Sequence, residues 1–188
     1  MNLAPEKERI ILGIDPGTAV MGYGVVTERG KDLALVTLGI IKLSHLSNHA
    51  LKLQAIFKKT TEIINAYHPD CIALEAPFYG KNIQSMLKLG RAQGVAMAAG
   101  LALDIPIFEY APRKIKQAVT GNGNAGKEQV ASMLQTLLKF KESPKFLDAT
   151  DGLAAAVCHS FQKVNGNSNL QNYSGWAAFV KDNQDRIK

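Results

Sequence analysis

The chain has 188 residues, 46% of them hydrophobic and 20% charged, with a formal net charge of +6. These values are typical of one globular domain with a full-sized core, and they argue against a disordered or fibrous protein. We find neither a transmembrane segment nor a secretory signal and therefore expect a cytoplasmic protein, whose positive charge suits a polyanionic partner. Cys71 and Cys158 lie in apolar surroundings, and we expect both to be buried, reduced thiols.

The first expected strand ends at a carboxylate. Residues 9–14 form an apolar, β-branched run, which is typical of a strand buried on both faces. The run stops at Asp15-Pro16-Gly17, a turn signal. A charge at the end of a core strand is costly unless it is paired or bound to a cation. Asp15 is therefore either a residue that starts the turn or part of an active site.

A meander and a crossover helix follow. We expect strands at about 21–27 and 33–43, joined by a turn at residues 29–31, which makes three antiparallel strands. Residues 49–67 have helical periodicity, with one apolar face made by Leu53, Ile56, Phe57, Thr60, Ile63, Ile64 and Tyr67. Residues 71–74 are expected to form a fourth buried strand, and the crossover helix favours parallel pairing with the first strand.

The fourth strand also ends at a carboxylate, Glu75, which is followed by Ala76 and Pro77. If the first and fourth strands are parallel, Asp15 and Glu75 both emerge at the carboxyl edge of the sheet. Open α/β sheets usually hold their sites at this edge.

A long helix is expected at about 83–103. Small residues recur every four positions along it, at Gly90, Gly94, Ala98 and Ala102. Such a stripe allows another helix to approach closely, and the spacing fits an oligomer interface and tight packing on the sheet equally well.

Basic residues follow a short fifth strand expected at 105–110. Pro112 fits the first turn of a helix that carries Arg113, Lys114 and Lys116. The loop 121–126 then leads to Lys127 and another amphipathic helix, whose apolar positions are Val130, Leu134, Leu137 and Leu138. Contacts from these basic side chains to phosphates would supply affinity for a nucleic acid without recognising its base sequence.

The last helix, at about 148–162, begins with Asp148 and Asp151, which are three residues apart and share one helix face. Acids are common in a first turn, so the pair alone indicates little. Together with Asp15 and Glu75, however, the pair makes a cluster of like charges that is unfavourable unless cations occupy it. Oxygen ligands without His or Cys favour Mg²⁺ or Mn²⁺, and two such ions suit phosphodiester hydrolysis.

The segments IDPGT, EAPF and DATDGLAAA, in this order, resemble the RuvC family of Holliday junction resolvases over about residues 9–163. The resemblance implies an α/β, ribonuclease-H-like fold, with a five-stranded mixed sheet flanked by helices on both faces. We accordingly assign residues 1–163 to the nuclease domain and expect a loosely ordered tail at 164–188.

The resemblance also implies roles for particular residues. Asp15, Glu75, Asp148 and Asp151 match the metal-binding catalytic carboxylates of the family. Phe78 matches an aromatic residue that stacks on junction bases, although Pro77 before it departs from the pattern. Lys116 and Lys127 match basic residues beside the scissile phosphates, and the long helix matches the dimer interface.

The sequence therefore predicts a homodimeric endonuclease that resolves four-way DNA junctions by paired symmetric nicks during recombination and repair. The implied cofactor is Mg²⁺, with two ions per active site and Mn²⁺ as a substitute, and the implied partner is a branch-migration complex of the RuvA and RuvB type. Three alternatives are a related nuclease acting on structured RNA, a catalytically silent nucleic-acid-binding module, and an actin-like or sugar-kinase-type ATPase. The silent module should lack a carboxylate, and the ATPases need a second lobe and a longer chain.

Overall fold

The computed structural model describes residues 8–77, 82–141 and 147–162. Phe78 and the predicted tail at 164–188 lie outside these residues. The described elements are β1 (Arg9–Asp15), β2 (Val20–Arg29), β3 (Asp32–Lys42), α1 (His49–Tyr67), β4 (Cys71–Glu75), α2 (Ile83–Leu101), β5 (Ile107–Tyr110), α3 (Pro112–Thr120), α4 (Lys127–Leu138) and α5 (Leu147–Phe161).

The five strands form one mixed sheet in the order β3-β2-β1-β4-β5. β1, β2 and β3 pair antiparallel, and the turn between β2 and β3 uses Gly30 at a φ of 62°. β4 pairs parallel with β1, and β5 pairs parallel with β4. The meander and the parallel fourth strand predicted from the sequence are thus confirmed. Because Ile14 is in register with Leu74, β1 and β4 end side by side.

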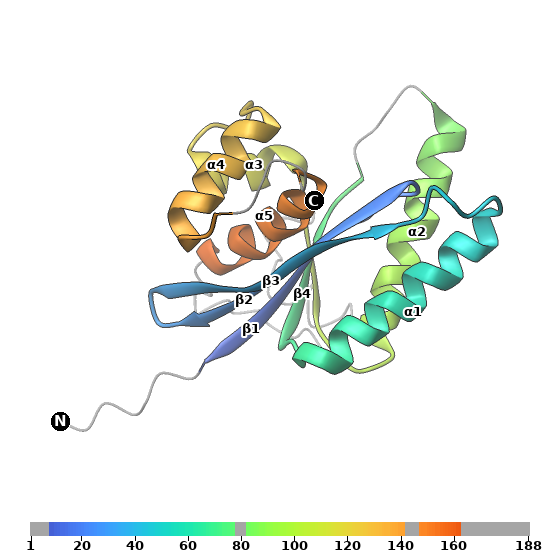
Figure 1. The fold of residues 1–188 in the computed structure, drawn as a ribbon, viewed down its shortest axis with the longest axis horizontal. Coiled ribbons are helices and arrows are strands. Elements are labelled where there is room, and N and C mark those ends of the chain that lie inside the picture. Colours follow the sequence, from blue (N-terminus) through green and yellow to red (C-terminus); the bar gives the residue numbers. More distant parts are fainter. Residues whose placement is uncertain (1–7, 78–81, 142–146, 163–188) are drawn as a thin grey trace, which may run out of the picture.

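Helices cover both faces of the sheet, as predicted. α1 and α2 lie on one face, and α3, α4 and α5 lie on the other (Figure 1). Successive strand residues point to opposite faces, so each strand contributes to two cores. Leu12 and Ile14 belong to the core under α1 and α2, whereas Ile11 belongs to the core under the other three helices. Cys71 and Cys158 are buried free thiols, as expected. Among the described residues, no helix is long and apolar enough to cross a membrane.

Some local expectations were wrong. α2 ends at Leu101 rather than near residue 103, because a turn containing Asp104 at a φ of 55° separates it from β5. Phe57 and Leu137, which were expected on buried faces, are 44% and 38% exposed. Each adjoins a buried position, Ile56 and Leu138, on a helix whose contact face is too narrow to cover both neighbours.

The small-residue stripe of α2 is exposed. The residues of α2 that are buried are instead Ala92, Gln93, Ala96, Ala99 and Gly100. A methyl group added at Gly90 or Gly94 would meet no atom within 4 Å. The interpretation that the stripe packs on the sheet of its own chain is therefore wrong.

α5 lies directly against the backbone of β1 and β2. A Cβ atom added to Gly13 would lie 2.1 Å from the carbonyl oxygen of Gly152, and one added to Gly22 would lie 1.8 Å from that of Asp148. Only glycine leaves room for this approach. These glycines therefore place the start of α5 beside the end of β1.

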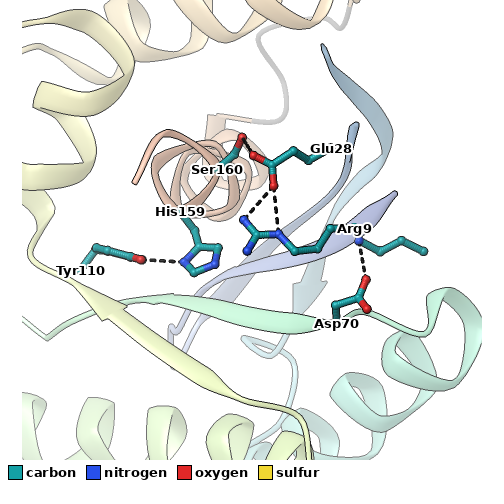
Figure 2. A network of polar contacts seen from close by, with 7 residues as sticks. Arg9, Glu28, Asp70, Tyr110, His159 and Ser160 are labelled. Atoms are coloured by element: carbon teal, nitrogen blue, oxygen red, sulfur yellow. Dashed lines mark hydrogen bonds and ion pairs between the residues drawn. The ribbon is translucent and has the colours of Figure 1, made fainter. Parts of the chain in front are cut away.

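A polar network ties the C-terminal part of α5 to the sheet (Figure 2). Arg9 of β1 pairs with Glu28 of β2 at 2.7 Å, and Ser160 donates a hydrogen bond to the same carboxylate at 3.0 Å. The hydroxyl of Tyr110 lies 2.6 Å from Nδ1 of the buried His159. Burial, and next the positive charge of Arg9, lower the pKa of His159 to about 4. The imidazole is therefore neutral near pH 7, and the network fixes the far end of α5.

We predict that Gly13→Ala destabilises the protein by about 2–3 kcal/mol, because the added methyl group meets backbone atoms that cannot move independently. Thermal or urea unfolding would measure this change. Gly126→Ala is the matched control, since the nearest atom to its added methyl group lies 3.5 Å away in the side chain of Glu128. The control should change the stability by less than about 1 kcal/mol. Equal stability of the two variants would contradict the close packing of α5.

Candidate active site

Two carboxylates stand at the ends of the central parallel strands. Asp15 ends β1 and Glu75 ends β4, and strand alternation places Asp15 on the same face as Gly13, which contacts α5. Both side chains are partly buried. Within the described residues, neither carboxylate has a hydrogen bond or an ion pair. Burial, followed by repulsion from Glu75, raises the pKa of Asp15 to about 7, and burial, followed by repulsion from Asp151, raises the pKa of Glu75 to about 6.

Two more carboxylates come from the first turns of α5. Asp148 is half exposed, whereas the side chain of Asp151 is 15% exposed. Nζ of Lys127 lies 2.6 Å from Oδ2 of Asp151 and 3.6 Å from Oδ1 of Asp148. Burial raises the pKa of Asp151, although its hydrogen bond from Lys127 acts in the opposite direction. The first turn of α5 and the first residue of α4 therefore meet through this ion pair.

The four carboxylates interact as one electrostatic group. The charges of Glu75, Asp151 and Asp148 all raise the pKa of Asp15. Lys127 lowers the pKa values of Asp15 and Glu75, so its attraction reaches both strand ends as well as α5. The structure thus brings together the four acids that the sequence placed on three separate elements.

The predicted basic residues fall into two groups. The positive charge of Lys116 of α3 acts on the carboxylates, since its attraction lowers the pKa values of Glu75 and Asp151. Arg113 and Lys114 of the same helix are exposed, and they do not contribute to these shifts. Nζ of Lys114 lies 5.1 Å from the ring centroid of Tyr110. Lys116 and Lys127 are therefore the predicted basic residues whose positive charges act on the acids.

A small cavity of about 160 Å³ adjoins the strand-end carboxylates. Its lining residues are Asp15, Pro16, Glu75, Ala76, Pro77, Leu89 and Gln93. Gln93 of α2 is 5% exposed, and its amide donates a hydrogen bond to Glu109 of β5. Sequence reasoning missed Gln93. The signal that could have identified Gln93 is its polar amide, because it lies on the same helix face as the apolar Leu89 and Ala96.

The donor set fits a hard divalent cation. All four acids supply oxygen ligands, which Mg²⁺ and Mn²⁺ prefer, and the two strand-end carboxylates lack a partner among the described residues. In the side-chain positions of the described chain, no three His, Cys, Asp or Glu residues lie close enough to hold one ion. Binding therefore requires the carboxylates to draw together, and the ammonium of Lys127 lies between two of them.

The sheet has the strand order β3-β2-β1-β4-β5, with helices on both faces and carboxylates at the ends of β1 and β4. These features define the ribonuclease-H-like class of proteins. Within this class the chain belongs to the RuvC family, because the model of "Crossover junction endodeoxyribonuclease RuvC" matches residues 11–159. Members of this family are structure-specific endonucleases that hydrolyse phosphodiester bonds.

Individual relatives agree with this assignment. The chain is 57% identical to the RuvC of Bacteroides fragilis over 188 aligned residues, which cover 99% of this chain and 100% of that protein. It is also 57% identical to the RuvC of Cytophaga hutchinsonii, with coverage of 96% and 89%. The structure of Thermus thermophilus RuvC in complex with a Holliday junction substrate superposes with a TM-score of 0.75 at 31% identity, covering 81% of this chain and 93% of that chain.

We predict that Asp15→Asn leaves the metal-free protein at least as stable as wild type at pH 8. The pKa of Asp15 is raised to about 7 by burial and then by Glu75, so its charged form costs stability as pH rises through that value. The advantage of the variant should shrink at pH 5, where the wild-type carboxyl is protonated. Urea unfolding in EDTA at both pH values measures the effect. A variant that is less stable than wild type at pH 8, or whose advantage grows at pH 5, would contradict the explanation.

Proposed function

We propose that this chain is a metal-dependent endonuclease that resolves four-way DNA junctions by paired symmetric nicks during recombination and repair. The observation that carries the proposal is the gathering of Asp15, Glu75, Asp148 and Asp151 at one edge of the sheet in a chain of the RuvC family. The Thermus relative, whose structure was solved with a Holliday junction, supports the substrate.

The four acids would hold the metal, and we propose Mg²⁺, with two ions per site and Mn²⁺ as a substitute. When bound, such ions activate water and stabilise the leaving oxygen of a phosphodiester. The protein's own contribution is to supply oxygen ligands from rigid elements. Asp15 and Glu75 are fixed by the paired ends of β1 and β4, and Asp148 and Asp151 are fixed by α5.

The basic residues would bind the DNA backbone. Lys116 and Lys127 lie beside the carboxylates, where a cation favours a transition state that gathers negative charge on the phosphate. Arg113 and Lys114 are exposed on the same helix as Lys116, where they could contact flanking phosphates and supply salt-dependent affinity. Phe78 follows β4 by three residues, and the proposal that it stacks on an unpaired base rests on the sequence resemblance.

A second copy of the chain would complete the enzyme. The exposed face of α2 carries Gly90 and Gly94 together with Ile83, Leu87 and Leu101, which are 71%, 51% and 56% exposed. An exposed apolar stripe with small residues suits close helix pairing across a two-fold axis, and two symmetric nicks require two sites. A branch-migration complex of the RuvA and RuvB type remains a prediction from the resemblance.

The alternative functions are less well supported. The family name specifies a deoxyribonuclease, which disfavours a nuclease acting on RNA. A catalytically silent module should lack one of the carboxylates, and all four are present in the sequence. The actin-like and sugar-kinase alternative is disfavoured by the match to the RuvC family over residues 11–159.

We predict that Glu75→Gln separates DNA binding from cleavage. The substitution keeps the size of the side chain and removes one charged oxygen ligand, so cleavage should fall by about 10³-fold. Binding should persist or tighten, because one repulsion towards the phosphates is lost. Gel-shift and cleavage assays with a four-way junction in Mg²⁺ would measure both quantities, with linear duplex and structured RNA as comparison substrates. Near wild-type cleavage by this variant would remove Glu75 from the site, and preferential cleavage of RNA would overturn the proposed substrate.

We also predict that Gly94→Leu weakens self-association by at least about tenfold and abolishes paired nicking, because the larger side chain blocks close approach of the two helices. Sedimentation would measure the association. Lys88→Leu is the matched control, since it adds the same side chain to an exposed position about 120° around α2. A Gly94→Leu protein that remains dimeric and fully active would refute this interface.

A further inference from the structure

Lys127 occupies a position that helix stability does not explain. It is the first residue of α4, where the helix dipole disfavours a positive charge, and Glu128 is the acidic residue in the same turn. The backbone N–H of Gly126 just before it is held by the side chain of Gln129 at 2.9 Å, so the start of the helix is well defined. The ammonium is therefore directed towards the carboxylates by a fixed backbone.

The ammonium lies where a cation is needed. It is 2.6 Å from Oδ2 of Asp151 and 3.6 Å from Oδ1 of Asp148, which are two of the oxygen ligands proposed for the metal. The Asp151 side chain is 15% exposed, so its charge is costly without a partner. An ammonium at hydrogen-bond distance from an oxygen blocks the approach of a second cation to that side of the oxygen. A metal ion and Lys127 would therefore compete for Asp151.

We propose that Lys127 is a positioning residue that serves as the resident counter-cation of the carboxylate site and releases Asp151 when a divalent ion binds. Before metal binding, its ion pair orients Asp151 and Asp148. Metal binding breaks this ion pair and frees the ammonium for another anion, such as a phosphate of the substrate. Because linkage is reciprocal, a phosphate that engages Lys127 also favours metal binding. The inference rests on the proposed metal site of these carboxylates.

The chain offers a matched control for this competition. Lys116 also attracts Glu75 and Asp151, but it makes no ion pair with either of them among the described residues. Lys127→Met and Lys116→Met each remove one positive charge near the site and keep an unbranched side chain. Both variants should strengthen metal binding through the loss of long-range repulsion. Lys127→Met should show an additional gain, because it also removes the competitor at Asp151.

The experiment uses the full chain without DNA. Calorimetric titration with Mg²⁺ and with Mn²⁺ should show about tenfold tighter binding for Lys127→Met than for wild type, and about two- to threefold tighter binding for Lys116→Met. Thermal unfolding gives a second readout. Lys127→Met should unfold at a lower temperature than wild type in EDTA, and it should gain more from saturating Mg²⁺ than wild type does.

The outcomes separate this inference from the proposed function. Equal metal affinities for the two lysine variants, or weaker binding by Lys127→Met, would overturn the counter-cation role and leave the metal site intact. If the wild type and Lys127→Met both bind no divalent ion, while wild type cleaves a junction without metal, the proposed metal site falls together with this inference. A larger gain for Lys127→Met than for Lys116→Met in both affinity and metal-induced stabilisation would support the inference.

Discussion

The close approach of α5 to the sheet is the constraint on which the site depends. Gly13 and Gly22 leave no side chain between the strands and the helix, and Gly152 does the same on the helix side. The first turns of α5 can therefore lie beside the end of β1, and Asp148 and Asp151 come within range of Asp15. Any residue with a Cβ at these positions would push the helix outward and move two of the four acids away from the other two.

The site concentrates negative charge that the protein's own side chains neutralise only in part. Burial and mutual repulsion raise the pKa values of Asp15 and Glu75, while Lys127 supplies a positive charge beside Asp151. Such an arrangement lowers the stability of the fold unless a cation is bound, and it is expected at a cation site. The strand ends tolerate it because the hydrogen-bonded sheet fixes their backbone regardless of the charge state.

α2 connects the site to the surface proposed for dimerisation. One face of this helix supplies Leu89 and Gln93 to the cavity beside Asp15 and Glu75. The adjoining face, about 100° around the helix, carries the exposed small-residue stripe. The hydrogen bond from Gln93 to Glu109 holds the helix against β5, the edge strand. A second copy that packs on the stripe would therefore contact the same helix that lines the cavity beside the carboxylates.

The sequence alone determined the antiparallel meander of β1, β2 and β3, the parallel pairing of β4 with β1, the bounds of α1 and the positions of Asp15 and Glu75 at the strand ends. These features follow from local patterns, since apolar runs, turn residues and crossover helices act within short stretches of chain. The ordered motifs also predicted that Asp148 and Asp151 belong with them, but not how the helix reaches them. Only the tertiary structure decided that the stripe of α2 is exposed, that Gln93 lines the cavity and that Lys127 pairs with Asp151. Each of these depends on how a helix is rotated and seated against elements distant in the sequence, and the periodicity of one helix does not fix that rotation.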